Sequence, residues 1–135
     1  MTTRIHHLLD RWLTESPDQP FIHLPDGRSL TFADLGALTT TAEAELLALG
    51  VLPGDRVLVV AENCPEHAAL ILACSRVGAW SCGVNARMAP AEIDAFAAKA
   101  DARVIYFTAA ASRAASAHAR RFDAVPSALN GMEHS

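Results

Sequence analysis

The sequence is poor in several residue types, and each shortage excludes a class of function. Lysine occurs once, at Lys99, and aromatic residues make up 6% of the 135 residues. A core must therefore be built mainly from Leu, Val, Ile and Ala. The net charge is −4 and the arginines are scattered, so the chain has no basic surface of the kind that nucleic acid requires. Nucleic-acid binding is not expected.

Cysteines and long apolar runs are also scarce. The three cysteines, Cys64, Cys74 and Cys82, form no CxxC motif, and their odd number argues against a disulfide framework. Cys74 and Cys82 lie in apolar runs and are predicted to be small buried hydrophobes. No apolar run approaches the roughly 20 residues that cross a bilayer. The N-terminal MTTRIHHLLDRWL carries charges where a signal peptide needs an apolar stretch, so we expect a cytoplasmic protein without a membrane span.

The residues that are present suit one folded domain, with 51% apolar and 19% charged residues. Apolar side chains at helical spacing predict a helix over 4–14. Asp26-Gly27 between two short apolar runs predicts a hairpin of 21–24 with 29–31. Thr31 and Asp34 form a capping box, which predicts a helix from 31 that ends at Gly50.

The pattern then changes to three apolar strands separated by two helices. The strands are expected at 57–61, 80–84 and 103–107, and the helices at 65–77 and 90–100. This order predicts an α/β fold with a β-α-β-α-β parallel sheet and flanking helices, preceded by the N-terminal helix and the hairpin. An Ala-rich helix is expected within 109–121, followed by a loose tail, PSALNGMEHS.

Several short motifs in this order resemble the N-terminal part of the adenylate-forming superfamily, which comprises acyl-CoA synthetases, nonribosomal peptide adenylation domains and luciferases. The resemblance covers about residues 5–108, which we take as the N-terminal α/β subdomain, with 109–135 as helix and tail. Its motifs are PDQPF at 17–21, LTFADL at 30–35, GVLPGDRV at 50–57, ENCPE at 62–66, RVGA at 76–79 and VNARMAPAEI at 84–93. One departure is Cys82-Gly83, where the family usually has proline and a larger apolar residue.

The resemblance implies ATP-dependent activation of a carboxylic acid as acyl-AMP and its transfer to a thiol such as coenzyme A, with ATP, Mg²⁺ and coenzyme A as cofactors of the full-length family. It also calls for a Ser/Thr-Gly-rich loop with a lysine and for a catalytic lysine on a mobile C-terminal domain. No residue of this sequence suits that loop. Lys99 lies far from any glycine-rich run, and Gly50 and Gly54 are predicted to end a helix and to form a turn. The Ser/Thr-rich segment 38–41 is predicted to lie within a helix. We therefore expect an inactive N-terminal fragment or truncated member that binds no cofactor itself, with the remainder of the ligase as its partner.

No catalytic, cofactor-binding or metal-binding residue is assigned from the sequence. Glu62–His67 follows a strand and opens a helix, which suits either a ligand site or a capped turn, with Asn63 or Cys64 at the cap, and we favour the turn. In a whole enzyme the loop could border the acyl pocket. Cys64 and His67 could form a thiol–imidazole pair, but no orienting acid accompanies them.

The other polar candidates are expected to be structural. His6 and His7 suggest metal binding, but adjacent helical residues diverge by roughly 100°, so solvated or half-buried histidines are expected. Arg87 matches a position where the family commonly has arginine, and we expect it to pair with Glu92 or Asp94. Arg113, Arg120 and Arg121 are expected on a solvated helix face.

Two further functions compete with the ligase reading. A self-standing interaction or scaffold module would self-associate through an exposed sheet edge or apolar helix faces. A flavodoxin-like receiver or nucleotide-binding domain would need a phosphate loop or an acidic cluster after the first strand, and Glu62 alone does not provide one.

Overall fold

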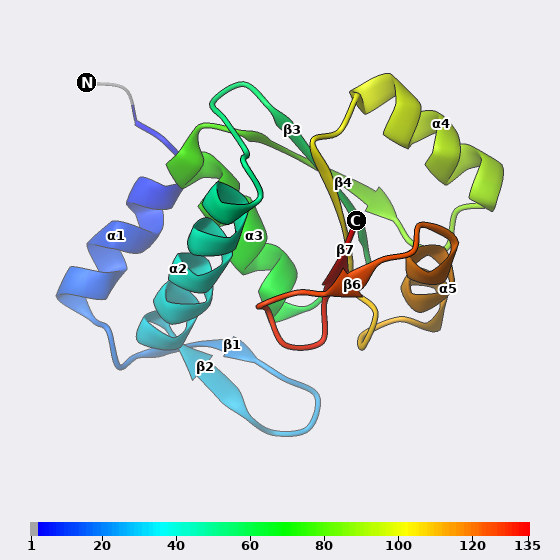
Figure 1. The fold of residues 1–135 in the computed structure, drawn as a ribbon. Helices are drawn as coiled ribbons and strands as arrows, with labels where there is room; N and C mark the ends of the chain where they lie inside the picture. The colour runs from blue at the N-terminus through cyan, green and yellow to red at the C-terminus, as the bar shows by residue number, and fades with distance from the viewer. Residues whose placement is uncertain (1–2) are drawn as a thin grey trace.

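A computed structural model describes residues 3–135 as an α/β fold (Figure 1). The helices are α1 His6–Glu15, α2 Phe32–Ala48, α3 Pro65–Val77, α4 Pro90–Ala100 and α5 Arg113–Arg121. The strands are β1 Pro20–His23, β2 Ser29–Thr31, β3 Arg56–Ala61, β4 Trp80–Asn85, β5 Val104–Phe107, β6 Val125–Pro126 and β7 Glu133–His134. Among these described residues, no helix is both long enough and apolar enough to cross a membrane.

The central sheet has the strand order β4-β3-β5-β7-β6. β3 pairs in parallel with β4 on one side and with β5 on the other. The predicted β-α-β-α-β unit is therefore confirmed. β4 keeps an unbroken register with β3 from Trp80 to Asn85, so the Cys82-Gly83 departure does not interrupt the pairing.

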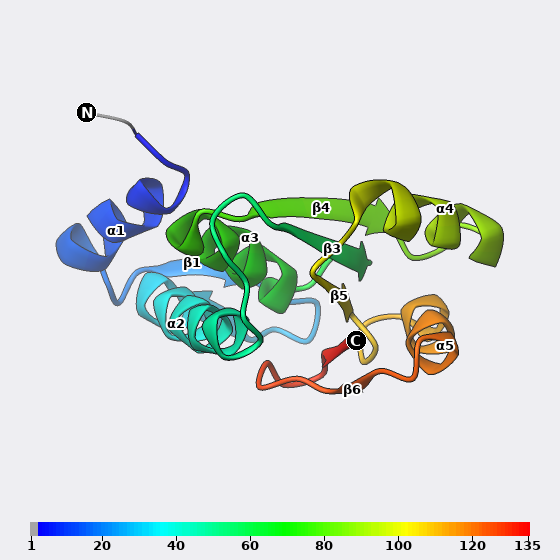
Figure 2. The same cartoon turned by 45° about the horizontal axis from the view of Figure 1, so that its top comes forward.

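Helices cover both faces of the sheet, and alternate residues of β3 face different helices. Val57 and Val59 join a core with α2 and α3, whereas Leu58 and Val60 pack with α4 and α5. All four side chains are at most 1% exposed. Figure 2 shows α2 and α3 on one side of the strands and α4 and α5 on the other. A strand enclosed on both faces reads as a continuous apolar run, which explains the pattern at 57–61.

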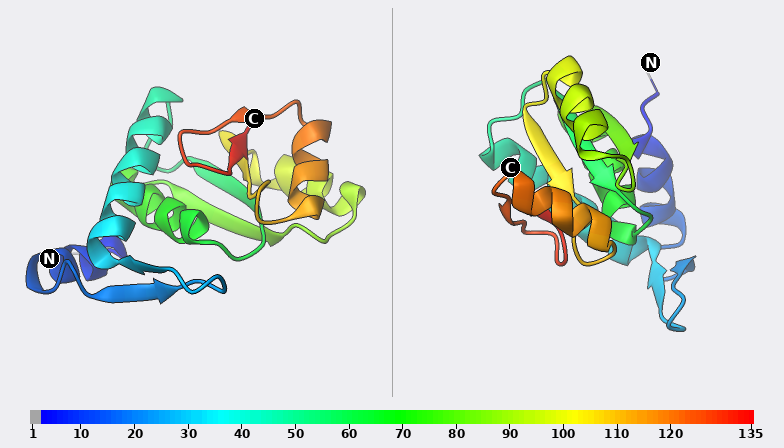
Figure 3. Two further views of the ribbon diagram at one scale, coloured as in Figure 1. Left: turned by 90° about the horizontal axis from the view of Figure 1, so that it is seen from below. Right: turned by 90° about the vertical axis from the view of Figure 1, so that its right-hand side faces the viewer.

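The N-terminal helices and the hairpin form a smaller third core. The predicted capping box is present: Asp34 N–H donates to Thr31 Oγ1 at 3.1 Å, and Thr31 N–H donates to Asp34 Oδ2 at 2.8 Å. Gly36 lets α1 approach α2, since a Cβ there would lie 2.7 Å from Leu13 Cδ2. The antiparallel β1–β2 hairpin extends from this end of the molecule (Figure 3).

The tail is ordered in the sheet, so the expectation of a loose tail is wrong. β7 pairs antiparallel with β5, and β6 pairs antiparallel with β7. Leu129 and Met132 are 1% and 3% exposed in the same core as α2 and α3. Two-residue strands have no hydrophobic periodicity, and their pairing depends on contacts with distant residues. The domain boundary at residue 108 stays a prediction.

Candidate functional site at the carboxyl edge of the sheet

Three loops meet at the carboxyl ends of β3, β4 and β5. In an open parallel sheet this edge is where ligands bind, because the loops after neighbouring strands converge there. Backbone bonds join the loops: Ala86 N–H donates to Ala61 O at 3.1 Å, and Thr108 N–H donates to Val60 O at 3.2 Å. Glu62 N–H also donates to the buried Thr108 hydroxyl at 3.0 Å. Hydrogen bonds therefore hold the loops after β3, β4 and β5 together along this edge.

Glu62 and Arg87 form the main ion pair of this edge. Arg87 Nε donates to Glu62 Oε1 at 2.6 Å, which links the loop after β3 to the loop after β4. Hydrogen bonding from Ser112 and from Arg87 holds the pKa of the Glu62 carboxyl below its ordinary value. At neutral pH the acid is ionised, and it serves as an anchor for Arg87 rather than as a proton donor.

The predicted partners of Arg87 were wrong. Glu92 accepts a hydrogen bond from Ala89 N–H at 2.9 Å and so closes the first turn of α4, while Asp94 pairs with Arg121 of α5. Both acids therefore contact other groups. Arg87 instead reaches back 25 residues to Glu62.

The Cys64–His67 corner is a strand-to-helix turn. Cys64 occupies the N-cap of α3 without a side-chain capping bond, and Pro65 opens the helix with Glu66 in the first turn. Burial raises the pKa of the Cys64 thiol to about 11. The thiol is therefore protonated at neutral pH, which is the opposite of what a catalytic thiol needs. His67 Nε2 is buried without a hydrogen-bond partner among residues 3–135, so this nitrogen does not take the proton of the Cys64 thiol.

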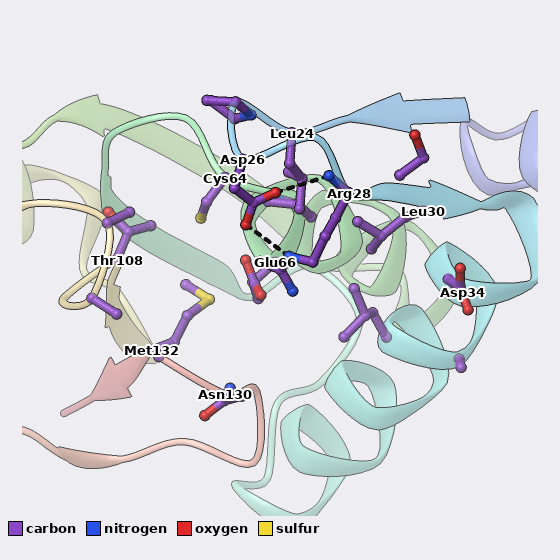
Figure 4. A pocket seen from close by; sticks show the side chains of 18 of the residues that line it. Leu24, Asp26, Arg28, Leu30, Asp34, Cys64, Glu66, Thr108, Asn130 and Met132 are labelled. Carbon is purple, nitrogen blue, oxygen red and sulfur yellow. Dashed lines mark hydrogen bonds and ion pairs between the residues drawn. The ribbon is translucent and has the colours of Figure 1, made fainter. Parts of the chain in front are cut away.

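A cleft of about 990 Å³ lies beside the same corner (Figure 4). The hairpin, α2, the N-terminus of α3, the loop after β5 and the tail line this open cleft. Figure 4 shows Cys64 and Glu66 facing Asn130 and Met132 across the cleft, with Asp26 and Arg28 paired on the side of the hairpin. Its charged groups are mainly acids, so it offers no cradle for phosphate.

The groups that bind ATP in the family have no counterpart at this edge of residues 3–135. Gly50 and Gly54 precede β3 and so lie at its amino end, opposite the loops just described. Lys99 is exposed in the last turn of α4. The hydroxyl of Thr39, in the predicted 38–41 segment, is buried in α2 and donates to Leu35 O at 2.7 Å. These residues do not fit ATP or Mg²⁺, and no reaction step is assigned to them.

The remaining sequence candidates are distributed over the surface and the core. Arg113, Arg120 and Arg121 are exposed on α5, as predicted, although Arg121 also pairs with Asp94. Cys74 is buried, as predicted, whereas Cys82 is only half-buried. The rings of His6 and His7 do not diverge: their centroids are 4.3 Å apart, edge to face.

His118 is a positioning residue that sequence reasoning missed. Arg121 donates to its Nδ1 at 2.8 Å, so Nε2 carries the proton and donates to the carbonyls of Ala86 and Met88, both at 3.1 Å. The imidazole thereby fixes the loop after β4 against α5. His118 is 5% exposed. Its place on the apolar face of a helix was the sequence signal that could have identified it.

Comparison with known proteins identifies this architecture. A family model described as AMP-binding enzyme matches residues 9–131, which extends the resemblance seen from motifs beyond residue 108. The chain is 33% identical over 98 residues to 2-succinylbenzoate–CoA ligase of Oceanobacillus iheyensis, covering 70% of this chain and 20% of the relative. It is 42% identical over 80 residues to 4-coumarate–CoA ligase 2 of Oryza sativa subsp. japonica, and this match covers 58% of this chain and 14% of the relative.

A solved structure shows the same fold. The N-terminal domain of FACL13 from Mycobacterium tuberculosis superimposes with a TM-score of 0.72 at 27% identity, covering 77% of this chain and 26% of that one. The chain thus spans about a fifth or less of the length of the two curated relatives, at 20% and 14%. Since the family model matches all of the sheet-forming strands except β7, the chain belongs to the AMP-binding enzyme family.

Proposed function

We propose that these residues form the first subdomain of an ATP-dependent acid–CoA ligase. The observation that carries the proposal is the parallel β4-β3-β5 sheet with its motif-bearing loops, in a chain whose similar proteins include several CoA ligases. In the whole enzyme a carboxylate would displace pyrophosphate from ATP, and a thiol such as coenzyme A would then displace AMP from the acyl-adenylate. A cytoplasmic location is part of the same proposal.

We further propose that the 135 residues alone do not catalyse adenylation. The support is chemical: phosphoryl charge must be neutralised by backbone N–H groups and cations, and Lys99 and the two nearest glycines lie away from the carboxyl edge. The role of this subdomain would be to provide a rigid wall for the rest of the enzyme. Its cleft beside Cys64 would then be closed by the remainder of the ligase.

Isotope exchange tests the catalytic half of the proposal. The purified chain is incubated with ATP, Mg²⁺, labelled pyrophosphate and a panel of carboxylic acids, with full-length 4-coumarate–CoA ligase 2 as positive control. We expect no acid-dependent label in ATP, and robust exchange would overturn the proposed inactivity. Thermal unfolding with and without ATP, AMP or coenzyme A should show no shift, whereas a shift of several degrees would reveal binding energy.

A segment exchange tests the structural half. The 80 matched residues of 4-coumarate–CoA ligase 2 are replaced with the corresponding segment of this chain, and thioester formation is measured. A matched exchange takes the equivalent segment from 2-succinylbenzoate–CoA ligase. If the segment has the proposed role, the first chimaera retains activity comparable to the second. Activity in the control chimaera alone would argue against it.

Self-association is a second candidate, favoured by one edge of the sheet. Within residues 3–135, β4 has a partner on one side only, and Trp80 on it is 68% exposed. The opposite edge is the two-residue β6, which contains Pro126, so an edge-paired dimer would form through the longer β4. Light scattering distinguishes the candidates, because a monomer that persists at high concentration excludes this pairing.

A further inference from the structure

Three metal-ligating side chains converge at the start of α1. One ligand atom from each of His6, His7 and Asp10 lies within 4.8 Å of the others. Both histidines reach the acid because Asp10 is three residues from His7 and four from His6, the two spacings that share a helix face. Among residues 3–135 no other such group of three is present.

The ring of His6 is already oriented by a second helix. Its Nδ1 lies 2.8 Å from Ser75 Oγ of α3, and the same hydroxyl oxygen accepts the His6 backbone N–H at 3.4 Å. When Nδ1 donates its proton to this oxygen, Nε2 presents its lone pair. Metal-binding histidines commonly have their second nitrogen fixed by a hydrogen bond of this kind.

We propose that His6, His7 and Asp10 bind a borderline divalent metal ion of the Zn²⁺ class, and that Ser75 positions His6 for it. Two imidazoles and one carboxylate suit Zn²⁺, Ni²⁺ or Cu²⁺ better than Mg²⁺, which prefers oxygen ligands. The site leaves at least one coordination position for water. Through the His6–Ser75 contact, the bound ion stabilises the docking of α1 on α3.

The ligands must draw closer to bind the ion. Zn²⁺ holds nitrogen at about 2.0–2.1 Å, which separates tetrahedral ligand atoms by roughly 3.3 Å. His7 and Asp10 are exposed, so side-chain rotations provide this movement. Asp10 Oδ1 lies 3.6 Å from Arg76 Nη2, which leaves Oδ2 for the ion.

Metal binding also changes one existing contact. Arg4 N–H now donates to His7 Nδ1 at 3.2 Å. With the ion on Nε2, Nδ1 carries a proton, so the exposed Arg4 N–H turns to water instead. The cationic side chains of Arg4 and Arg76 lie on the same side of the molecule and oppose the ion.

Calorimetric titration of the full 135-residue chain with ZnCl₂ at pH 7.5 tests the site. We expect one ion per chain, at least tenfold weaker binding in His7→Gln and in Asp10→Asn, and roughly tenfold weaker binding in Ser75→Ala. Zn²⁺ should raise the unfolding temperature of the parent chain but not of His7→Gln. Titration with Mg²⁺ should give no binding.

The matched control is His23→Gln, which removes another exposed histidine, on β1 and outside the group of three ligands. It should bind Zn²⁺ as the parent does. Circular dichroism verifies that each variant is folded. The proposal is overturned if the parent binds no Zn²⁺, or if folded His7→Gln and Asp10→Asn bind it unchanged, because the ion would then use other ligands. It does not depend on the ligase function, which these titrations leave untouched.

Discussion

The hydroxyl of Tyr106 donates a 2.8 Å hydrogen bond to the carboxylate of Glu45, 61 residues earlier in the chain. The same carboxylate accepts hydrogen bonds from the Ser127 hydroxyl at 2.6 Å and from the backbone N–H of Ala128. Glu45 lies on α2, Tyr106 on β5 and the other two donors in the tail. One acid therefore joins three segments that have no sequence proximity.

Removing the Tyr106 hydroxyl should destabilise the fold. Tyr106 is fully buried, and Tyr106→Phe keeps its ring while depriving Glu45 of a donor. A hydrogen bond to a charged group contributes about 1.5–3 kcal/mol, so the free energy of unfolding in urea should fall by about that amount. In a Glu45→Gln background the same change should cost less. Equal losses in both backgrounds would show that the two side chains are not coupled.

The Glu45 contacts should also make stability depend on pH. Burial alone would raise the pKa of Glu45, but hydrogen bonds from Ser127, Ala128 and Tyr106 outweigh it and hold the pKa below the ordinary 4.5. A lowered folded-state pKa gives stability that is present above about pH 4.5 and is lost as the pH falls through the folded-state pKa.

Urea unfolding between pH 7 and pH 3 measures this effect. The excess stability of the parent chain over Glu45→Gln should be largest at neutral pH and should shrink below about pH 4.5. Other acids titrate in both proteins, so the difference isolates Glu45. A constant difference across the whole range would contradict the prediction.

Two adjacent leucines of α2 offer a matched test of the core. Leu46 is 0% exposed and Leu47 is 58% exposed. Leu46→Ala removes buried methyl groups and leaves a cavity, so it should lower the free energy of unfolding by about 2–5 kcal/mol. Leu47→Ala should change it by less than about 0.5 kcal/mol. Similar losses in urea unfolding would show that α2 packs in a different rotation.

Cys64 should react slowly with alkylating reagents. Its pKa of about 11 means that its labelling by iodoacetamide should keep rising with pH up to about 11, whereas an ordinary thiol levels off near 8.5. Peptide mass spectrometry follows the rate at this residue. In urea the dependence should revert to that of an ordinary thiol. A plateau near neutral pH in the folded chain would instead support a thiol activated by His67.

The helices and parallel strands could be predicted because their signals are local. Thr31 and Asp34 form a capping box three residues apart, Gly78 ends α3 with a positive φ of 80°, and β3 is enclosed and therefore wholly apolar. Each depends on neighbouring residues. The family motifs, in matching order along the chain, added the resemblance to the adenylate-forming superfamily, whereas the order of the strands within the sheet was not predicted.

The tail and the site contacts could not be predicted because they depend on distant partners. Leu129 is buried only because the tail folds back onto α2 and β5. The sequence pairs Arg87 with acids a few residues away, whereas in the fold it pairs with Glu62 on the neighbouring loop. His6 is half-buried and His7 is exposed, as expected, but the approach of Asp10 one turn later was not considered in the sequence.

The antiparallel placement of β7 makes residues 133–134 a competitor for any other strand. β7 pairs with β5 at Tyr106 and Phe107, on the side away from β3. Another strand could pair with β5 there only after residues 133–134 dissociate from it, which would also disturb the contacts around Glu45. β5 can therefore pair either with β7 or with an added strand, but not with both. The pairing with β7 is favoured because β7 belongs to the same chain and so has a high effective concentration.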